Sequence, residues 1–285
     1  MSWFVFAALI FGAFLHALWN SFIKLSPDKP LETAYVNFLT SFISLPLLLL
    51  VGLPNSEVFP YIGLSVFLHI GYYYSLSSAY KYGDFSLAYP VMRGSAPLIL
   101  TILSALYLGE FPSYFVCIGI GAISFGIMLL GIKKIQDVSH HRKAFSFALM
   151  NAVIIALYTM VDGIGVNRSS DPWGYIFLLM FVDGFLFPAL LLWRRGVYQF
   201  QEIDMYLRKR FWIALIGAFA TLGAYGIALW AMTQSPISIV AALRELSVLI
   251  AVFISWIFLK ENISSYRWIG IFLIICGAVC LRLFI

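Results

Sequence analysis

Ten runs of about twenty apolar residues divide the 285-residue chain, and short polar stretches separate them. A helix of about twenty residues spans the hydrocarbon core of a bilayer and satisfies its own backbone hydrogen bonds there. The runs therefore predict an all-α membrane protein with ten transmembrane helices. The expected spans are residues 3–23, 33–52, 60–80, 86–109, 114–132, 145–166, 173–193, 211–232, 237–259 and 266–284.

The composition excludes several other classes of protein. Hydrophobic residues make up 62% of the chain and charged residues only 11%, whereas an average soluble domain carries about 25% charged residues. So few charges cannot form the polar surface of a soluble enzyme, a disordered protein or a nucleic-acid module. We expect no nucleic-acid partner, and we assign the net charge of +5 to loops that meet membrane lipids.

Sequence signatures of catalysis and of cofactor binding are missing. The sequence has no HExxH motif, no Walker loop, no dinucleotide fingerprint and no His/Cys cluster with zinc-ligand spacing. The three cysteines, Cys117, Cys276 and Cys280, lie inside apolar runs and imply no disulfide framework. We therefore expect no catalytic residues, no metal and no cofactor, and we do not expect an enzyme.

The lysines and arginines predict how the chain is oriented. Fourteen of the eighteen lie in the connections after the first, third, fifth, seventh and ninth spans. Only Arg168 and Arg282 lie on the other side, and an excess of basic residues marks cytoplasmic loops. The expected location is the cytoplasmic membrane, with both termini outside the cytoplasm.

The second half of the chain repeats the first at an ungapped offset of 151 residues. The aligned pairs include Arg93/Arg244, Leu108/Leu259, Glu110/Glu261, Gly119/Gly270 and Gly126/Gly277. Each half holds five expected spans, and an odd number makes the second half enter the membrane from the opposite side. We therefore expect two inverted five-helix repeats, residues 1–139 and 140–285. Such repeats are typical of secondary transporters.

Several short motifs link this arrangement to a known family. Leu-Gly-Glu (108–110) and Leu-Lys-Glu (259–261) end the fourth and ninth spans, and a glycine-rich span follows each. With these motifs the chain resembles, over nearly its whole length, the EamA-type ten-helix members of the drug/metabolite transporter superfamily. The resemblance implies transport of small organic solutes through a cavity lined mainly by the first, third, fourth, sixth, eighth and ninth spans. Typical members keep both termini inside, whereas the charges here predict them outside.

Three further motifs resemble a subgroup of that family that is associated with phosphonate-utilisation genes. They are His-Ala-Leu-Trp-Asn (16–20), Tyr-Pro-Val-Met-Arg-Gly (89–94) and Tyr-Thr-Met-Val-Asp-Gly (158–163).

A few charged residues interrupt the apolar spans, where each costs about 2.5–3.5 kcal/mol if it faces lipid. These residues must be paired or must face water. They are Arg93, Asp162, Asp183, Arg244 and Glu245. Asp183 stands beside Gly184, and we expect it to serve helix packing.

Arg93 lies on a polar or small face of the fourth span, together with Pro90 and Pro97. The two prolines favour a bend there and make this span a candidate gate. In a functional interpretation Arg93 clamps a carboxylate or phosphonate of the substrate. In a structural interpretation it is the partner of Asp162 or Glu245.

Arg244, the repeat mate of Arg93, has the same two interpretations. It is a second arm of an anion clamp, or it is neutralised by its neighbour Glu245. Asp162 and Glu245 are the candidates for proton coupling, because burial favours the neutral form of a carboxyl group. For Asp162 the alternative is a structural salt bridge to an arginine.

The remaining candidate substrate contacts are polar or aromatic residues within the spans. They are Tyr89, His16, Trp19, Asn20, Tyr73, Tyr158 and Trp230. The competing interpretation is that these residues pack between helices or form the interfacial aromatic belt.

The sequence therefore predicts a secondary transporter that moves small organic metabolites, anionic or zwitterionic, by alternating access. Its expected partners are the solute, membrane lipids and, in a coupled mechanism, protons, and the chain is a monomer or a homodimer. Two alternatives stay open: an uncoupled facilitator and an intramembrane lipid-modifying enzyme.

Overall fold

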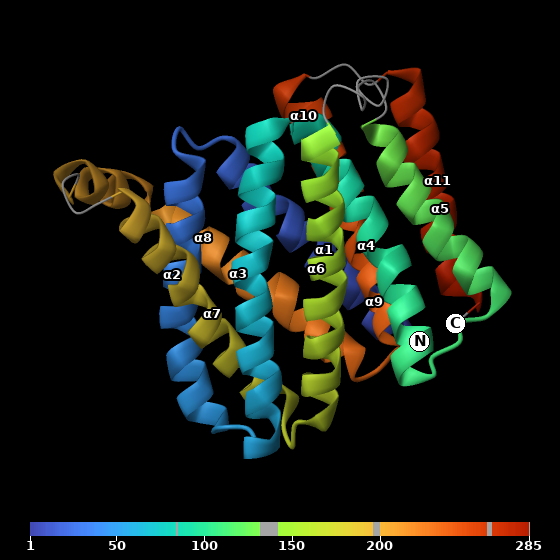
Figure 1. Ribbon diagram of the computed structural model, residues 1–285, viewed down its shortest axis with the longest axis horizontal. Coiled ribbons are helices and arrows are strands. Elements are labelled where there is room, and N and C mark those ends of the chain that lie inside the picture. Colours follow the sequence, from blue (N-terminus) through green and yellow to red (C-terminus); the bar gives the residue numbers. More distant parts are fainter. Residues whose placement is uncertain (84, 132–141, 196–199, 261–263, 285) are drawn as a thin grey trace.

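A computed structural model describes residues 1–83, 85–131, 142–195, 200–260 and 264–284. In these ranges the chain is helical and contains no strand, which confirms the predicted all-α class (Figure 1). The helices are α1 (Trp3–Lys24), α2 (Lys29–Val51), η1 (Ser56–Val58), α3 (Phe59–Tyr82), α4 (Phe85–Leu108), α5 (Tyr114–Leu130), α6 (Arg142–Arg168), α7 (Pro172–Arg195), α8 (Phe200–Met232), α9 (Ile237–Arg244), α10 (Leu246–Leu259) and α11 (Ser265–Phe284).

Each of the ten predicted spans corresponds to a helix or, for the ninth span, to a pair of consecutive helices. Within the described ranges, eight segments are long and apolar enough to cross, and one of them is the combined stretch Ile237–Ile257 from α9 and α10. The other two predicted spans correspond to the shorter apolar helix α5 and to α3, which has 24 residues but is not among those eight. The predicted ten-helix membrane protein is thus confirmed.

Polar caps and prolines set the starts of several helices. The hydroxyl of Ser2 accepts a hydrogen bond from the Val5 backbone at 3.2 Å, and the Asp28 carboxylate accepts one from Leu31 at 3.1 Å. Prolines occupy the first turns of α2 and α3, where a missing N–H leaves no helical bond unmade.

Two helices differ from the expected spans. The expected eighth span begins at residue 211, but α8 already begins at Phe200, because a helix can continue past the apolar segment that marks the membrane boundary. The ninth span is interrupted at Glu245, where the backbone N–H donates to the carbonyl of Ala242 at 3.1 Å. The helix α4, by contrast, continues without a break through Pro90 and Pro97.

Both termini lie at the same end of the helical bundle. Figure 1 shows the N- and C-terminal ends close together, with the α1–α2 connection at the opposite end. The guanidinium carbon of Arg282 lies 3.8 Å from the ring centroid of Trp3, so α11 and α1 meet at this end. This arrangement follows from an even number of crossings.

The packing of the helices repeats between the two halves. The helix α2 packs against its repeat mate α7, and α5 packs against its mate α11. The repeat also pairs α1 with α6, α3 with α8, and α4 with α9 and α10. Accordingly, α3 packs against α6 as α8 packs against α1. In the same way, α4 packs against α6 as α9 and α10 pack against α1. These pairs confirm two inverted five-helix repeats. The expected boundary between residues 139 and 140 lies outside the described residues.

Glycines bring α5 and α11 into backbone contact. A Cβ atom on Gly126 would lie 2.7 Å from the carbonyl oxygen of Gly270, and one on Gly277 would lie 2.6 Å from that of Gly119. These are the four glycines that the 151-residue offset pairs. Only residues without side chains allow this approach of the two helices.

The two halves also share an unusual backbone conformation. Gly109 follows α4 with a φ of 67°, and its repeat mate Lys260 follows α10 with a φ of 51°. Both lie in the left-handed region that ends many helices. The repeat therefore extends to the ends of these helices.

Candidate substrate-binding cavity

A cavity of about 160 Å³ lies between the two halves of the bundle. Its size is close to that of a roughly 150 Å³ protein cavity that holds benzene. Eight helices contribute to its wall. The lining residues are His16, Trp19, Asn20, Asn37, Thr40, His69, Tyr72, Tyr73, Tyr89, Arg93, Tyr158, Met180, Asp183, Gly184, Thr221, Tyr225 and Arg244.

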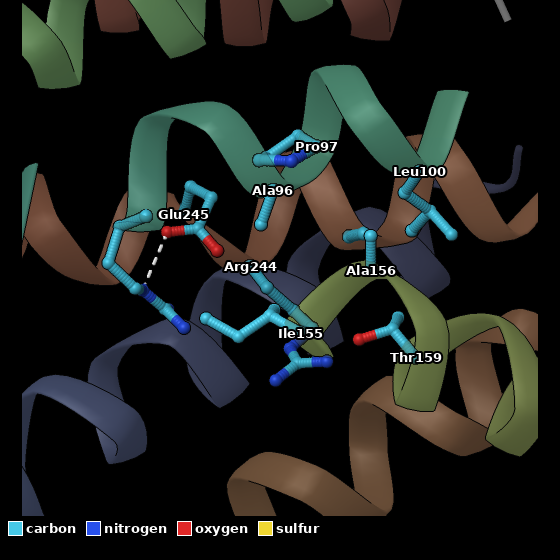
Figure 2. Close-up of a pocket in the computed structure, with 10 residues that line it drawn as sticks. Ala96, Pro97, Leu100, Ile155, Ala156, Thr159, Arg244 and Glu245 are labelled. Atoms are coloured by element: carbon cyan, nitrogen blue, oxygen red, sulfur yellow. Dashed lines mark ion pairs between the residues drawn. The ribbon is translucent and has the colours of Figure 1, made fainter. Parts of the chain in front are cut away.

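The cavity gathers most of the candidate residues from the sequence. Those that line it are His16, Trp19, Asn20, Tyr73, Tyr89, Arg93, Tyr158 and Arg244. Trp230 is not among them, because its ring packs edge-to-face on Phe4 at 5.8 Å. Pro97 and Glu245 line a neighbouring cavity of about 10 Å³ that Figure 2 shows. Pro90 is buried and lines neither cavity.

Arg93 forms a buried ion pair with Glu245. Its Nε lies 2.9 Å from Oε2 of Glu245, the pair that the dashed line marks in Figure 2. Its Nη2 also donates to the hydroxyl of Ser247 at 3.5 Å. The pair joins α4 of the first half to the α9–α10 junction of the second half. Asp162 and Glu245 were the two structural partners expected for Arg93, and the structure shows the ion pair with Glu245.

Arg244 adjoins Glu245 in the chain, but its side chain takes a different direction (Figure 2). Its guanidinium carbon lies 5.0 Å from the ring centroid of Tyr225, within the range of a cation–π contact. Within the described ranges Arg244 makes no ion pair, and it lines both cavities. Glu245 is therefore the counter-ion of Arg93 and does not pair with Arg244.

Asp162 is fully buried behind the cavity and is held by tyrosines. The hydroxyl of Tyr175 donates to Oδ1 at 3.1 Å, and that of Tyr225 donates to Oδ2 at 2.5 Å. Among the residues that the structure describes, no arginine pairs with Asp162. The two hydroxyls take the place of the arginine expected in the structural interpretation of this residue.

Sequence reasoning missed the cavity's acidic side. Asp183, expected to serve packing, lines the cavity, and its Oδ1 lies 3.3 Å from Nδ1 of His69. Its neighbour Gly184 does serve packing, because a side chain there would collide with Ser41 of α2. The spacing of His69, Tyr72 and Tyr73 at i, i+3 and i+4 was the available signal, since it places three polar rings on one helix face.

Local contacts position the polar residues of α1 and α3. The indole N–H of Trp19 donates to Nδ1 of His16 at 3.4 Å, and the Asn20 amide donates to the His16 carbonyl at 2.7 Å. The Tyr73 hydroxyl accepts a hydrogen bond from Asn37 at 3.1 Å. These contacts hold the side chains at the wall and fix their orientation.

Comparison with known proteins agrees with this architecture. The chain is similar to a protein of known crystal structure, with a TM-score of 0.72 and 16% sequence identity over 98% of this chain and 95% of that chain. At that identity the likeness shows the fold alone. A search of the curated proteins found no match.

A family model supplies the assignment. The model of the EamA-like transporter family matches residues 2–132 and again residues 142–283, once in each half of the chain. The family is one of membrane transporters of small solutes. The double match covers nearly the whole sequence and agrees with the resemblance described for the motifs at the ends of the fourth and ninth spans. The chain therefore belongs to the EamA-like transporter family.

Proposed function

We propose that this transporter moves a small organic solute with an anionic group across the cytoplasmic membrane, and that Arg244 binds that group. The observation that carries this proposal is the position of Arg244 in the wall of the larger cavity without an ion-pair partner among the described residues. A guanidinium within a membrane is costly unless it is paired or serves a site. Its geometry suits a carboxylate or a phosphonate.

Arg93 enters the mechanism through its ion pair with Glu245. While the pair is intact, the charge of Arg93 is neutralised and Arg244 is the principal anion-binding group. Protonation of Glu245 removes its charge and leaves Arg93 available to the same solute from the opposite repeat. Glu245 is for this reason the preferred residue for proton coupling, whereas Asp162 lies outside the lining of the cavity.

Alternating access is supported by the inverted repeats, since two such halves can exchange conformations around a site between them. The α9–α10 interruption at Glu245 lies beside this site. Together with Pro90 and Pro97 in α4, it forms the proposed gate region.

Thermal unfolding of the purified protein with a panel of short carboxylates, phosphonates and amines tests the anion site. We expect compounds with an anionic group to stabilise the wild type. The same compounds should stabilise the control Arg168→Gln, whose arginine is near Tyr61 at one end of the bundle, but not Arg244→Gln. Stabilisation by amines alone contradicts the proposal.

Transport into proteoliposomes separates coupled transport from facilitation. A coupled transporter accumulates the stabilising compound only under a pH gradient, whereas a facilitator equilibrates it without one. We expect accumulation that is lost in Glu245→Gln. Lipid turnover by the same preparation would instead support the enzyme alternative.

The proposed orientation places both termini outside the cytoplasm, because fourteen of the eighteen basic residues lie in the sequence connections after the odd-numbered spans. A reporter that is active only in the cytoplasm provides the test. We expect it to be inactive after residue 285 and active when inserted in the α1–α2 connection. The reverse result would overturn this orientation.

A further inference from the structure

Two residues of opposite charge inside the spans line the cavity without forming an ion pair with each other. Arg93 and Glu245 neutralise one another, and Asp162 accepts hydrogen bonds from two tyrosine hydroxyls. Of the five charged residues that interrupt the spans, Arg244 and Asp183 are then left. Both line the same cavity, and they do not pair with each other.

Among the described residues His69 is the ion-pair partner of Asp183, and no lysine or arginine pairs with it. Nδ1 of His69 lies 3.3 Å away, but neither this nitrogen nor Oδ1 of Asp183 makes a hydrogen bond within the described ranges. A carboxylate oxygen that is removed from water and has no hydrogen-bond donor is costly. Asp183 therefore has capacity for a further cationic donor.

Aromatic rings adjoin the acidic side of the cavity. Tyr72 and Tyr73 come from α3, with ring centroids 5.3 Å apart, and the ring of Tyr158 lies 4.4 Å from that of His69. All of these residues line the cavity with Asp183. An acidic group beside tyrosine rings is suited to an organic ammonium group, which gains from both the carboxylate and the ring faces.

We propose that Asp183 binds a cationic nitrogen of the transported solute, so that the solute is a zwitterion with its anionic end at Arg244 and its ammonium end at Asp183. This inference rests on the proposed anion site. It adds a specificity-determining residue on α7 and narrows the substrate class. A zwitterion supplies a counter-charge to both residues at once, whereas an anion or a cation alone supplies a counter-charge to only one of them.

Equilibrium binding of a matched series to the purified full-length protein tests the proposal. The zwitterions are glycine, β-alanine and 4-aminobutyrate, which increase the separation of the two charges. Acetate, propionate and butyrate lack the ammonium group, and methylamine, ethylamine and propylamine lack the carboxylate. We expect one zwitterion to bind the wild type about tenfold or more tightly than its matched acid and amine.

The variants distinguish the two charged residues. Asp183→Asn should lose about tenfold of the preference for the zwitterion over the acid and keep the wild-type affinity for the acid. Arg244→Gln should lose binding of both the acid and the zwitterion. Asp183→Glu, which keeps the charge, should keep the preference. Asp204→Asn, in an exposed carboxylate that pairs with Arg208, is the matched control and should behave as the wild type.

The outcomes separate this inference from the proposed anion site. Equal binding of acids and zwitterions by the wild type, or a full preference in Asp183→Asn, overturns the role of Asp183 and leaves Arg244 intact. Binding of amines alone contradicts the anion site. Absence of binding throughout the series contradicts both. If Asp183→Asn is not monodisperse, the test is the comparison of the wild type with Asp183→Glu. The proposal predicts that Asp183→Glu keeps the preference for zwitterions, because it keeps the negative charge, and loss of the preference contradicts it.

Discussion

Arg93 of the first repeat and Glu245 of the second form a buried ion pair, with Nε and Oε2 2.9 Å apart. Glu245 directly follows Arg244, the residue that the repeat aligns with Arg93. Arg93 is therefore neutralised by Glu245, the residue that follows its repeat mate Arg244 in the chain. This asymmetry leaves the cavity with one uncompensated guanidinium instead of two.

Arg93→Gln should destabilise the protein by about 3–5 kcal/mol, because it leaves the Glu245 carboxylate buried without its partner. The double variant with Met at both positions should recover most of this loss, since it buries no charge. Unfolding of the purified protein in denaturant measures both. An equal loss in the single and double variants would show that the side-chain volumes, and not the charges, matter.

Gly126→Ala should separate α5 from α11. The new Cβ would lie 2.7 Å from the carbonyl oxygen of Gly270, and overpacking of this kind costs about 1–3 kcal/mol. Gly121→Ala is the matched control in the same helix, because no atom lies within 4 Å of the position of its Cβ. The prediction fails if the two variants have the same thermal stability.

Tyr175→Phe and Tyr225→Phe should each destabilise the protein, because each removes one hydrogen bond to the buried Asp162 carboxylate. Hydrogen bonds to charged groups contribute about 1.5–3 kcal/mol. Tyr107→Phe, in an exposed ring, serves as the control and should leave the midpoint of thermal unfolding unchanged. A wild-type midpoint in both buried variants would refute the role of these hydroxyls.

Lys260→Gly should stabilise the protein. Lysine at a φ of 51° carries a strain of roughly 1–2 kcal/mol that glycine avoids, although glycine loses more entropy on folding. The reciprocal variant Gly109→Ala should be destabilising, because its backbone has a φ of 67°. Denaturation midpoints test the two opposite signs, and a decrease in both would contradict the interpretation.

Arg210→Gln should open the cavity from the end that carries the α1–α2 connection. Arg210 of α8 pairs there with the fully buried Glu32 of α2, and the Tyr206 hydroxyl donates to the same carboxylate at 2.5 Å. This contact joins the two halves. We expect faster labelling of Asn20→Cys by a polar thiol reagent in a background without the three native cysteines.

The control for that experiment is Arg208→Gln, since Arg208 is exposed and its pair with Asp204 stays within α8. Unchanged labelling in both variants would show that the Glu32 contact does not restrict access to the cavity.

Much of the fold could be predicted from the sequence, because a bilayer requires long apolar helices and the repeat adds their relative orientation. The interruption at Glu245 could not, since no proline or glycine marks it in the sequence. The start of α8 at Phe200 was also missed, because hydropathy reports the membrane boundary and not the end of a helix.

The candidate site was predicted only in part. The motifs at residues 16–20 and 89–94 contributed side chains to the cavity, and the two arginines line it. The partners of Arg93 and Asp162 depend on which helices meet, and this information is tertiary. Asp183 was assigned to packing because it adjoins Gly184, yet neighbouring residues in a helix point about 100° apart and can serve different surfaces.

The contact between α5 and α11 has a consequence for motion. The repeat aligns Gly119 with Gly270 and Gly126 with Gly277. If each repeat took the conformation of the other, the contact of Gly119 with Gly277 would become the contact of Gly270 with Gly126. The two contacts would exchange, and the pair of helices would keep the same contacts. Any two conformations related by this exchange therefore share the same crossing. In the proposed alternating-access cycle, the close approach of α5 and α11 at these four glycines would therefore be the same in both conformations.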